Sequence, residues 1–292
     1  MPLTHIVAAS LVMTAVAWTA GSPQTDRPLA GRTILITGST DGLGREVALR
    51  VGELGAHVIV HGRNRERGEA VAAEIAQRGG SARFYAADFA SLDAVRGLAA
   101  AIRRDYERID VLVNNAGIWN RGDRQVSADG HELHFAVNYL AGYLLTRELL
   151  PLVTAAAPSR IINVASIAQS PIDFDDVMLE RPGAAGRGYG QSKLAQILFT
   201  MDLADELGSQ QVTVVALHPA TLMDTSMVRE TGLEPRATVD EGAAAVMRLI
   251  TSPDVPSGSY FNGQQEAKAH AQAYDAEARR RLRELSRALT GV

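Results

Sequence analysis

The chain has 292 residues, 46% of them hydrophobic and 21% charged, which suffices for one large α/β domain and leaves little room for a second. Its net charge of −4 gives no global electrostatic reason to bind nucleic acid. It contains no cysteine, which excludes disulfides, thiolate chemistry and cysteine-ligated metals.

The N-terminal residues 6–20 form a nearly uncharged stretch, IVAASLVMTAVAWTA, followed by a proline-containing linker up to residue 30. The stretch is shorter than the roughly 20 apolar residues that span a bilayer, and it has the length of a signal-peptide core. Several interpretations of this stretch stay open. It would be a membrane anchor facing the cytosol, an export leader, an extra N-terminal helix, or the result of a start site placed too far upstream. We therefore expect an apolar leader or anchor plus linker in residues 1–30 and a single domain in residues 31–292. The protein would be cytoplasmic, membrane-associated on the cytosolic side, or exported.

From residue 32, short runs rich in Val and Ile alternate with longer amphipathic stretches. Unbroken apolar strands are typical of a parallel sheet that is buried on both faces. The runs predict strands at 33–37, 57–61, 82–86, 110–114, 160–165, 212–217 and 258–262. The stretches between them predict helices at 43–54, 65–78, 91–106, 130–154, 189–208, 240–251 and 266–288. This alternation predicts an α/β fold: a single doubly wound parallel sheet of the Rossmann type with helices on both faces.

A glycine-rich turn, TGSTDGLG, follows the first strand and opens the first helix. Closely spaced glycines at a helix N-terminus let backbone N–H groups approach a phosphate. Glycines alone often mark only a tight loop, so it is their position between a strand and a helix that indicates phosphate binding. The turn predicts a set of cofactor-binding residues: Gly38, Ser39, Thr40, Asp41, Gly42, Leu43 and Gly44.

The end of the second strand bears on the choice of cofactor. It carries Arg63 and Asn64 but no acid that would bind a ribose 2′-hydroxyl. Arg63 would pair with a 2′-phosphate, which favours NADP(H) over NAD(H), although a lone loop arginine is often only solvated. Asp88, after the third strand, would either meet an adenine amino group or cap the next helix.

Two further sites lie after a strand or at the beginning of a helix. Asn115, Ala116 and Gly117 follow the fourth strand, where asparagines hold irregular backbone and small residues leave room for a ring. Tyr189 and Lys193 stand four residues apart on a predicted helix. A free tyrosine has a pKa of about 10, so we expect the Lys193 charge to favour tyrosinate and tune Tyr189 for acid–base catalysis.

Five motifs occur in order: TGSTDGLG (37–44), NNAG (114–117), Asn138 in AVNYL, Ser166 in NVASI, and Tyr189–Lys193 in YGQSK. In this arrangement the chain resembles the short-chain dehydrogenase/reductase family from about residue 31 to the C-terminus. The segment IDFDDVMLER, with YGQSKLAQILFT and LHPATLMDT, resembles the retinol-dehydrogenase-like subgroup. Many members have glycine after the proline of the last motif, whereas Pro219 here precedes Ala220, which leaves open the conformation of a loop that carries the cofactor-binding candidates Pro219 and Thr221.

The resemblance implies an oxidoreductase that transfers hydride between NADP(H) and an alcohol or carbonyl compound. It implies that Tyr189 protonates the carbonyl oxygen, that Ser166 hydrogen-bonds the same oxygen, and that Lys193 also binds the nicotinamide ribose. Asn138 would hold a water that links the lysine to solvent. The resemblance also implies a homodimer or homotetramer that pairs through the helices carrying Asn138 and Tyr189.

Apolar residues of segment 167–188 predict a pocket wall that suits a retinoid, a steroid, a long aldehyde or an aromatic ketone. Four acids in the same segment would disfavour anionic substrates if they faced the site. The alternative is a non-catalytic NADP(H)-sensing regulatory protein, against which the intact Ser, Tyr and Lys argue. We expect no metal site, because His131 and His134 stand at helical spacing without a suitable third ligand.

Overall fold

The computed structural model describes Met1 and residues 27–292, and an eight-stranded sheet lies at the centre of this part of the chain. The strand order is β3-β2-β1-β4-β5-β6-β7-β8, and every neighbouring pair is parallel except β7 and β8. The strands are β1 (Thr33–Ile36), β2 (His57–Gly62), β3 (Ser81–Ala86), β4 (Val111–Asn114), β5 (Ser159–Val164), β6 (Val212–His218), β7 (Tyr260–Asn262) and β8 (Gln265–Ala267). The order runs outward in both directions from β1 and β4, which confirms the doubly wound Rossmann fold.

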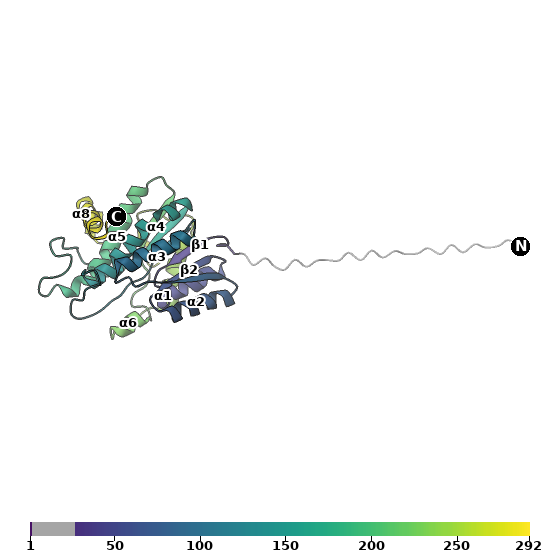
Figure 1. Cartoon of the computed structure of the whole chain (residues 1–292), viewed down its shortest axis with the longest axis horizontal. Coiled ribbons are helices and arrows are strands. Elements are labelled where there is room, and N and C mark those ends of the chain that lie inside the picture. Colours follow the sequence, from purple (N-terminus) through teal and green to yellow (C-terminus); the bar gives the residue numbers. More distant parts are fainter. Residues whose placement is uncertain (2–26) are drawn as a thin grey trace.

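Helices cover both faces of the sheet (Figure 1). One face is covered by α1 (Gly42–Glu53), α2 (Arg65–Gln77) and α7 (Val239–Thr251), whose apolar residues form one buried cluster with the strands. The other is covered by α3 (Leu92–Asp105), α4 (Ala141–Ala155) and α5 (Gly188–Leu207), which form the second cluster. The short α6 (Ser226–Glu230), which the sequence analysis did not predict, follows β6. Polar N-caps begin several of these helices, and the Asn64 carboxamide on α2 is one example.

The segment predicted as one helix at 130–154 is divided in two. A π-helical turn, η1 (Phe135–Leu140), precedes α4, and it carries Asn138 in its middle. The Glu132 carboxylate accepts the backbone N–H groups of His134 (3.1 Å) and Phe135 (2.7 Å) and so defines where the helical segment begins. Single π turns are rare, and they often mark functional positions.

The C-terminal prediction of a helix over 266–288 is wrong for its first ten residues. Gly263, with φ of +59°, begins a two-residue turn that folds β8 back onto β7. A 3-10 turn, η3 (Ala271–Tyr274), and helix η2 (Ala185–Arg187) are further short elements, and α8 begins only at Ala276 and ends at Thr290.

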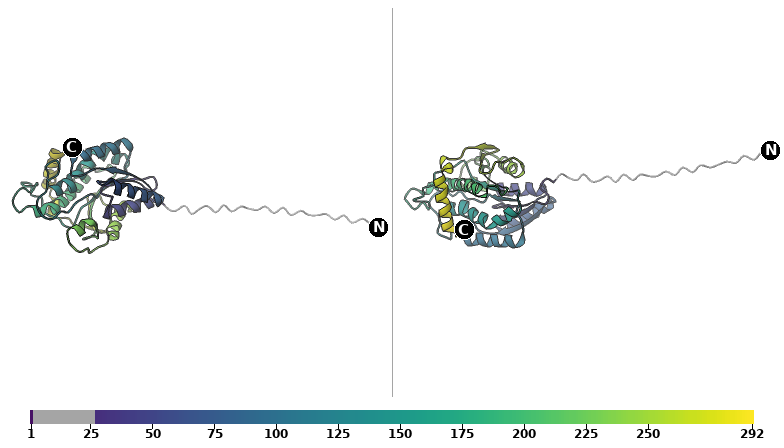
Figure 2. Two further views of the ribbon diagram at one scale, coloured as in Figure 1. Left: turned by 60° about the horizontal axis from the view of Figure 1, so that its bottom comes forward. Right: turned by 90° about the horizontal axis from the view of Figure 1, so that it is seen from above.

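Helix α8 packs against α5, and Figure 2 shows it in yellow along one edge of the molecule. Leu282 is 2% exposed in this contact, and the hydroxyl groups of Tyr139 and Ser286 are hydrogen-bonded at 2.7 Å. As a result α5 is buried almost all round within one chain, as its lack of a polar stripe implies. Pairing of two copies through the helices of Asn138 and Tyr189 stays a prediction.

No helix among the described residues is both long and apolar enough to cross a membrane. The apolar stretch 6–20 lies outside those residues. Its interpretations, and the division of the chain at residue 30, therefore stay predictions.

Candidate functional site

A cleft of about 680 Å³ opens where the strand order reverses, at the carboxyl ends of the central strands. Open α/β sheets bind their ligands at this position. The cleft is lined by every residue that the sequence analysis proposed for the site except Ser39 and Asn138. It extends from Arg63 and Arg67 at one end to Tyr189 and Lys193 at the other.

The glycine turn is shaped for close approach of a phosphate. Gly38 has a φ of +63°, and a Cβ there would lie 2.8 Å from the Cα of Ala116. A Cβ on Gly44 would lie 2.3 Å from the Gly38 carbonyl oxygen. The Asn115 amide group donates to the carbonyls of Thr37 (2.8 Å) and Gly38 (3.1 Å) and holds the turn in place. The first turn of α1 carries no acid, although the Asp41 carboxylate at the N-cap accepts the Gly42 N–H at 2.8 Å, and the glycine backbone of the turn fits a dinucleotide pyrophosphate.

Ser39 and Asn138 support the cleft from behind. The Ser39 hydroxyl donates to the Ile36 carbonyl (2.7 Å) and accepts the His61 backbone N–H (3.0 Å), so it joins β1 to β2. The Asn138 carboxamide accepts from the Ile118 N–H (2.7 Å) and donates to the Ser192 hydroxyl (3.0 Å). These contacts connect the segment after β4 to α5.

The end of the cleft beside β2 is basic. Arg63 and Asn64 are exposed there, and the Asn64 side chain caps α2 by accepting the Arg67 N–H at 2.9 Å. Arg67, in the first turn of α2, also lines the cleft, although the sequence analysis did not name it. Asp88 accepts the Ala90 N–H at 3.0 Å, whereas Ser91 caps α3, so the interpretation of Asp88 as the cap of that helix is wrong.

A buried histidine lies beneath the glycine turn. His61 Nδ1 accepts the Gly38 N–H at 3.2 Å, and the ring stacks on Phe89 with 4.4 Å between centroids. Burial lowers the pKa of His61 to about 4, so the imidazole is neutral at physiological pH and can accept this hydrogen bond.

Ser166, Tyr189 and Lys193 meet at the opposite end of the cleft. Lys193 Nζ donates to the Val164 carbonyl (2.9 Å) and to Gln196 Oε1 (3.0 Å), and it lies 5.7 Å from the centre of the Tyr189 ring. Burial lowers the pKa of Lys193 to about 7. Burial also raises the pKa of Tyr189, and the polar influence of Ser166 only partly opposes this.

These shifts run against the expectation that the Lys193 charge favours tyrosinate. The reason is geometric, because the Lys193 amine is directed at a carbonyl and an amide oxygen. Desolvation, which disfavours the charged form of each group, therefore dominates both pKa values. In this arrangement Tyr189 is a protonated phenol, and Lys193 titrates close to neutral pH.

The wall around Tyr189 is apolar but comes from other segments than predicted. It includes Trp119, whose ring stacks on that of Tyr189 at 5.1 Å and 28°. Other apolar residues that line the cleft are Leu133, Val137, Met223, Met227 and Val228. From segment 167–188 only Ile167 and Ala168 line the cleft. Ile172, Val177 and Leu179 are instead buried in the protein core.

The four acids of that segment bind arginines and backbone instead of facing the cleft. Asp173 lies 3.5 Å from Arg181, and Asp175 lies 3.3 Å from Arg281 on α8. Asp176 accepts the backbone N–H of Glu180 at 2.7 Å. The condition under which these acids would disfavour anionic substrates is therefore not met.

Within residues 27–292, no three His, Asp or Glu side chains gather in a way that could hold a metal ion. His131 and His134 belong to different environments. The His134 ring is bonded to Glu132, and the His131 ring makes no hydrogen bond with the described residues.

The sequence matches the model of the short chain dehydrogenase family over residues 32–235. The chain therefore belongs to that family, whose members are dehydrogenases and reductases. Human retinol dehydrogenase 13 is 34% identical over 318 residues, which cover 100% of this chain and 95% of the relative. Mouse retinol dehydrogenase 14 is 36% identical over an alignment that covers 90% of this chain and 86% of the relative. The retinol-dehydrogenase-like subgroup is thus confirmed.

Solved structures agree on the fold. An uncharacterised protein from Mycobacterium paratuberculosis superposes with a TM-score of 0.77 at 30% identity, covering 90% of this chain and 95% of that one. The Pseudomonas aeruginosa RhlG complex with NADP superposes with a TM-score of 0.66 at 27% identity, covering 81% of this chain and 96% of that one. The Brucella melitensis 3-ketoacyl-(acyl-carrier-protein) reductase complex with NADH superposes with a TM-score of 0.63 at 28% identity, covering 80% of this chain and 97% of that one.

Proposed function

We propose that this protein transfers hydride between NADP(H) and an apolar alcohol or carbonyl substrate of retinoid-, steroid- or long-aldehyde-like character. The observation that carries the proposal is that Ser166, Tyr189 and Lys193 line the same cleft as the glycine turn. A nicotinamide cofactor bound there supplies or accepts the hydride, and the protein's own residues bind, orient and exchange the proton.

The cofactor assignment rests on charge. The backbone from Gly38 to Gly44 would hold the pyrophosphate, and Arg63 and Arg67 would hold a 2′-phosphate at the end of β2, where no acid competes. Similar structures carry NADP in RhlG and NADH in the ketoacyl reductase. Similarity alone therefore does not select the cofactor, and the two arginines favour NADP(H).

The chemistry follows from the two pKa shifts. Since burial raises the pKa of Tyr189, its phenol stays protonated and is ready to donate to a carbonyl oxygen during reduction. Ser166 would donate a hydrogen bond to the same oxygen. Lys193, with a pKa of about 7, exchanges protons at neutral pH and can restore the phenol proton. A Cβ on Gly117 would lie 3.4 Å from Lys193 Nζ, so glycine leaves free space beside the amine.

The direct test measures oxidation of NADPH and of NADH by the purified protein with retinaldehyde, aliphatic aldehydes and aromatic ketones. We expect turnover of apolar carbonyl compounds with NADPH preferred. Tight binding of NADPH without turnover of any carbonyl would instead favour the regulatory, NADP(H)-sensing function.

The cofactor preference has its own test in Arg63→Ala. Loss of a charge-assisted hydrogen bond costs about 1.5–3 kcal/mol, so the Kd for NADPH should rise about 10- to 100-fold while that for NADH stays within about twofold. Arg65→Ala is the matched control, because Arg65 pairs with Glu69 at 3.2 Å and does not line the cleft. Equal losses of NADPH and NADH affinity in Arg63→Ala would contradict the assignment.

A further inference from the structure

We infer that Glu132 and His134 hold Trp119 flat against Tyr189, and that the indole held in this way selects carbonyl compounds whose C=O adjoins a planar, conjugated chain or ring. His134 is thus a positioning residue, and Trp119 a residue that determines specificity. The selectivity part rests on the proposed function, whereas the positioning part does not.

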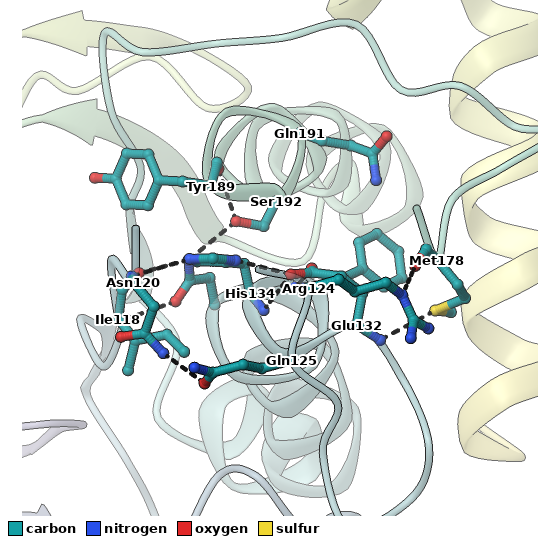
Figure 3. Close-up of polar contacts among 12 residues, drawn as sticks. Ile118, Asn120, Arg124, Gln125, Glu132, His134, Met178, Tyr189, Gln191 and Ser192 are labelled. Atoms are coloured by element: carbon teal, nitrogen blue, oxygen red, sulfur yellow. Dashed lines mark hydrogen bonds and ion pairs between the residues drawn. The ribbon is translucent and has the colours of Figure 1, made fainter. Parts of the chain in front are cut away.

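The hydrogen bonds around His134 define which of its ring nitrogens carries the proton (Figure 3). Its Nε2 accepts the backbone N–H of Asn120 at 3.1 Å, so this nitrogen carries no proton. The proton is on Nδ1, which donates to Glu132 Oε1 at 2.8 Å. Both residues are buried, with Glu132 2% and His134 8% exposed. The carboxylate therefore orients the imidazole, and the imidazole holds the backbone of Asn120.

This hydrogen bond determines where Trp119 lies. Asn120 follows Trp119 directly and is held by His134, while Ile118 precedes it and is held by Asn138 through both backbone groups (2.7 and 3.1 Å). With its backbone fixed on both sides, the indole stacks on Tyr189 at 5.1 Å and 28°. The edge of the His134 ring meets the same phenol ring at 6.4 Å and 84°.

Helix α5 begins with a residue that accommodates this pair. A Cβ on Gly188 would lie 2.8 Å from Glu132 Oε1 and 2.8 Å from His134 Nδ1. Any larger residue immediately before Tyr189 would displace the two side chains. Capping of the helical segment accounts for Glu132, but it does not account for the imidazole that extends from Glu132 to the Trp119 segment.

The consequence for substrates follows from the place of the indole in the cleft. Trp119 lines the cleft beside the proton donor and gives it a flat aromatic wall. A conjugated system coplanar with its carbonyl group can stack on such a wall, whereas a flexible saturated chain contacts it only in part. Aromatic stacking of this kind is worth about 2- to 10-fold in binding.

Fluorescence tests the positioning without any substrate. The chain has two tryptophans, so Trp18→Phe leaves Trp119 as the sole reporter. In that background His134→Phe should raise the acrylamide quenching constant at least about twofold, because the Asn120 N–H loses its acceptor. His134→Gln, whose amide oxygen can accept the same N–H, should restore the parental value.

His131→Phe is the matched control and should leave quenching unchanged. Gly188→Ala displaces the Glu132–His134 pair without removing it and should also raise quenching, so it carries the test if His134→Phe does not fold. Parental quenching in His134→Phe, or in Gly188→Ala where that variant replaces it, overturns the positioning role.

Turnover tests the selectivity. The ratio of kcat/KM for trans-cinnamaldehyde to that for 3-phenylpropanal, its saturated analogue, should fall about 3- to 10-fold in Trp119→Leu and in His134→Phe. His134→Gln should retain the parental ratio. An unchanged ratio in Trp119→Leu overturns the selectivity role. Absence of turnover of both aldehydes by the parent protein, with parental NADPH binding, refutes the proposed function and with it the selectivity, while the quenching result still decides the positioning role.

Discussion

Replacement of Lys193 by methionine should change the way in which stability depends on pH. Lys193 is 4% exposed, and burial lowers its pKa from 10.5 to about 7. Between these two values the unfolded chain binds a proton at this position that the folded chain does not bind. Under that condition the free energy of unfolding rises with pH.

The size of the effect follows from the shift. At pH 7 the folded lysine is about half protonated and the unfolded lysine fully so, and at pH 9 only the unfolded lysine still carries its proton. Integration over this interval gives a gain of about 2 kcal/mol in the free energy of unfolding. Below about pH 6 both states are protonated, and the contribution of Lys193 no longer changes with pH.

Urea unfolding at pH 7 and pH 9 measures this for the wild-type chain, Lys193→Met and Lys268→Met. The difference between wild type and Lys193→Met should move by about 2 kcal/mol in favour of wild type at the higher pH, since other titrations cancel in the difference. Lys268, the other lysine of the chain, is exposed and serves as the control. A difference that stays constant within about 0.5 kcal/mol would refute the lowered pKa of Lys193.

Three further outcomes are expected. Tyr189→Phe should retain its NADPH dissociation constant within about twofold and lose at least about 100-fold in kcat, and retention of a tenth of the rate would remove Tyr189 from proton donation. Gly44→Ala should weaken NADPH binding at least about tenfold in calorimetric titration, because its Cβ would meet the Gly38 carbonyl at 2.3 Å; wild-type affinity would count against the phosphate role of the turn. Leu282→Ala should lose about 2–5 kcal/mol in urea unfolding, against about 0.5 kcal/mol or less for exposed Arg280→Ala, and equal losses would argue against docking of α8.

Most of the sheet could be predicted from the sequence because its strands are unbroken apolar runs. The predicted strands agree with β1 to β6 within one residue at each end. The C-terminal region could not be predicted in the same way, since residues 266–273 are rich in alanine and favour a helix by propensity. Pairing of β8 with β7 across the turn at Gly263 overrides that preference, and such pairing depends on the folded sheet.

The site divides along a similar line. The glycine turn, Tyr189 and Lys193 could be predicted because their spacing reflects local geometry of a turn and a helix. The apolar wall could not, because apolar residues of an irregular segment such as Val177 serve the core as well as they would serve a cleft. The direction of the Lys193 amine also depends on partners that only the fold supplies, and the rise in the Tyr189 pKa comes from burial, which the spacing of the two residues does not reveal.

The contact between α8 and α5 makes the helix that carries Tyr189 and Lys193 dependent on the C-terminal helix. If a protease cut the segment between β8 and α8, the departing helix would uncover the side of α5 that now faces Leu282. An apolar helix face that is newly exposed to water invites association with other chains. Loss of the C-terminal helix should therefore appear as aggregation and inactivation together, so that nicked preparations lose soluble protein and activity in the same proportion.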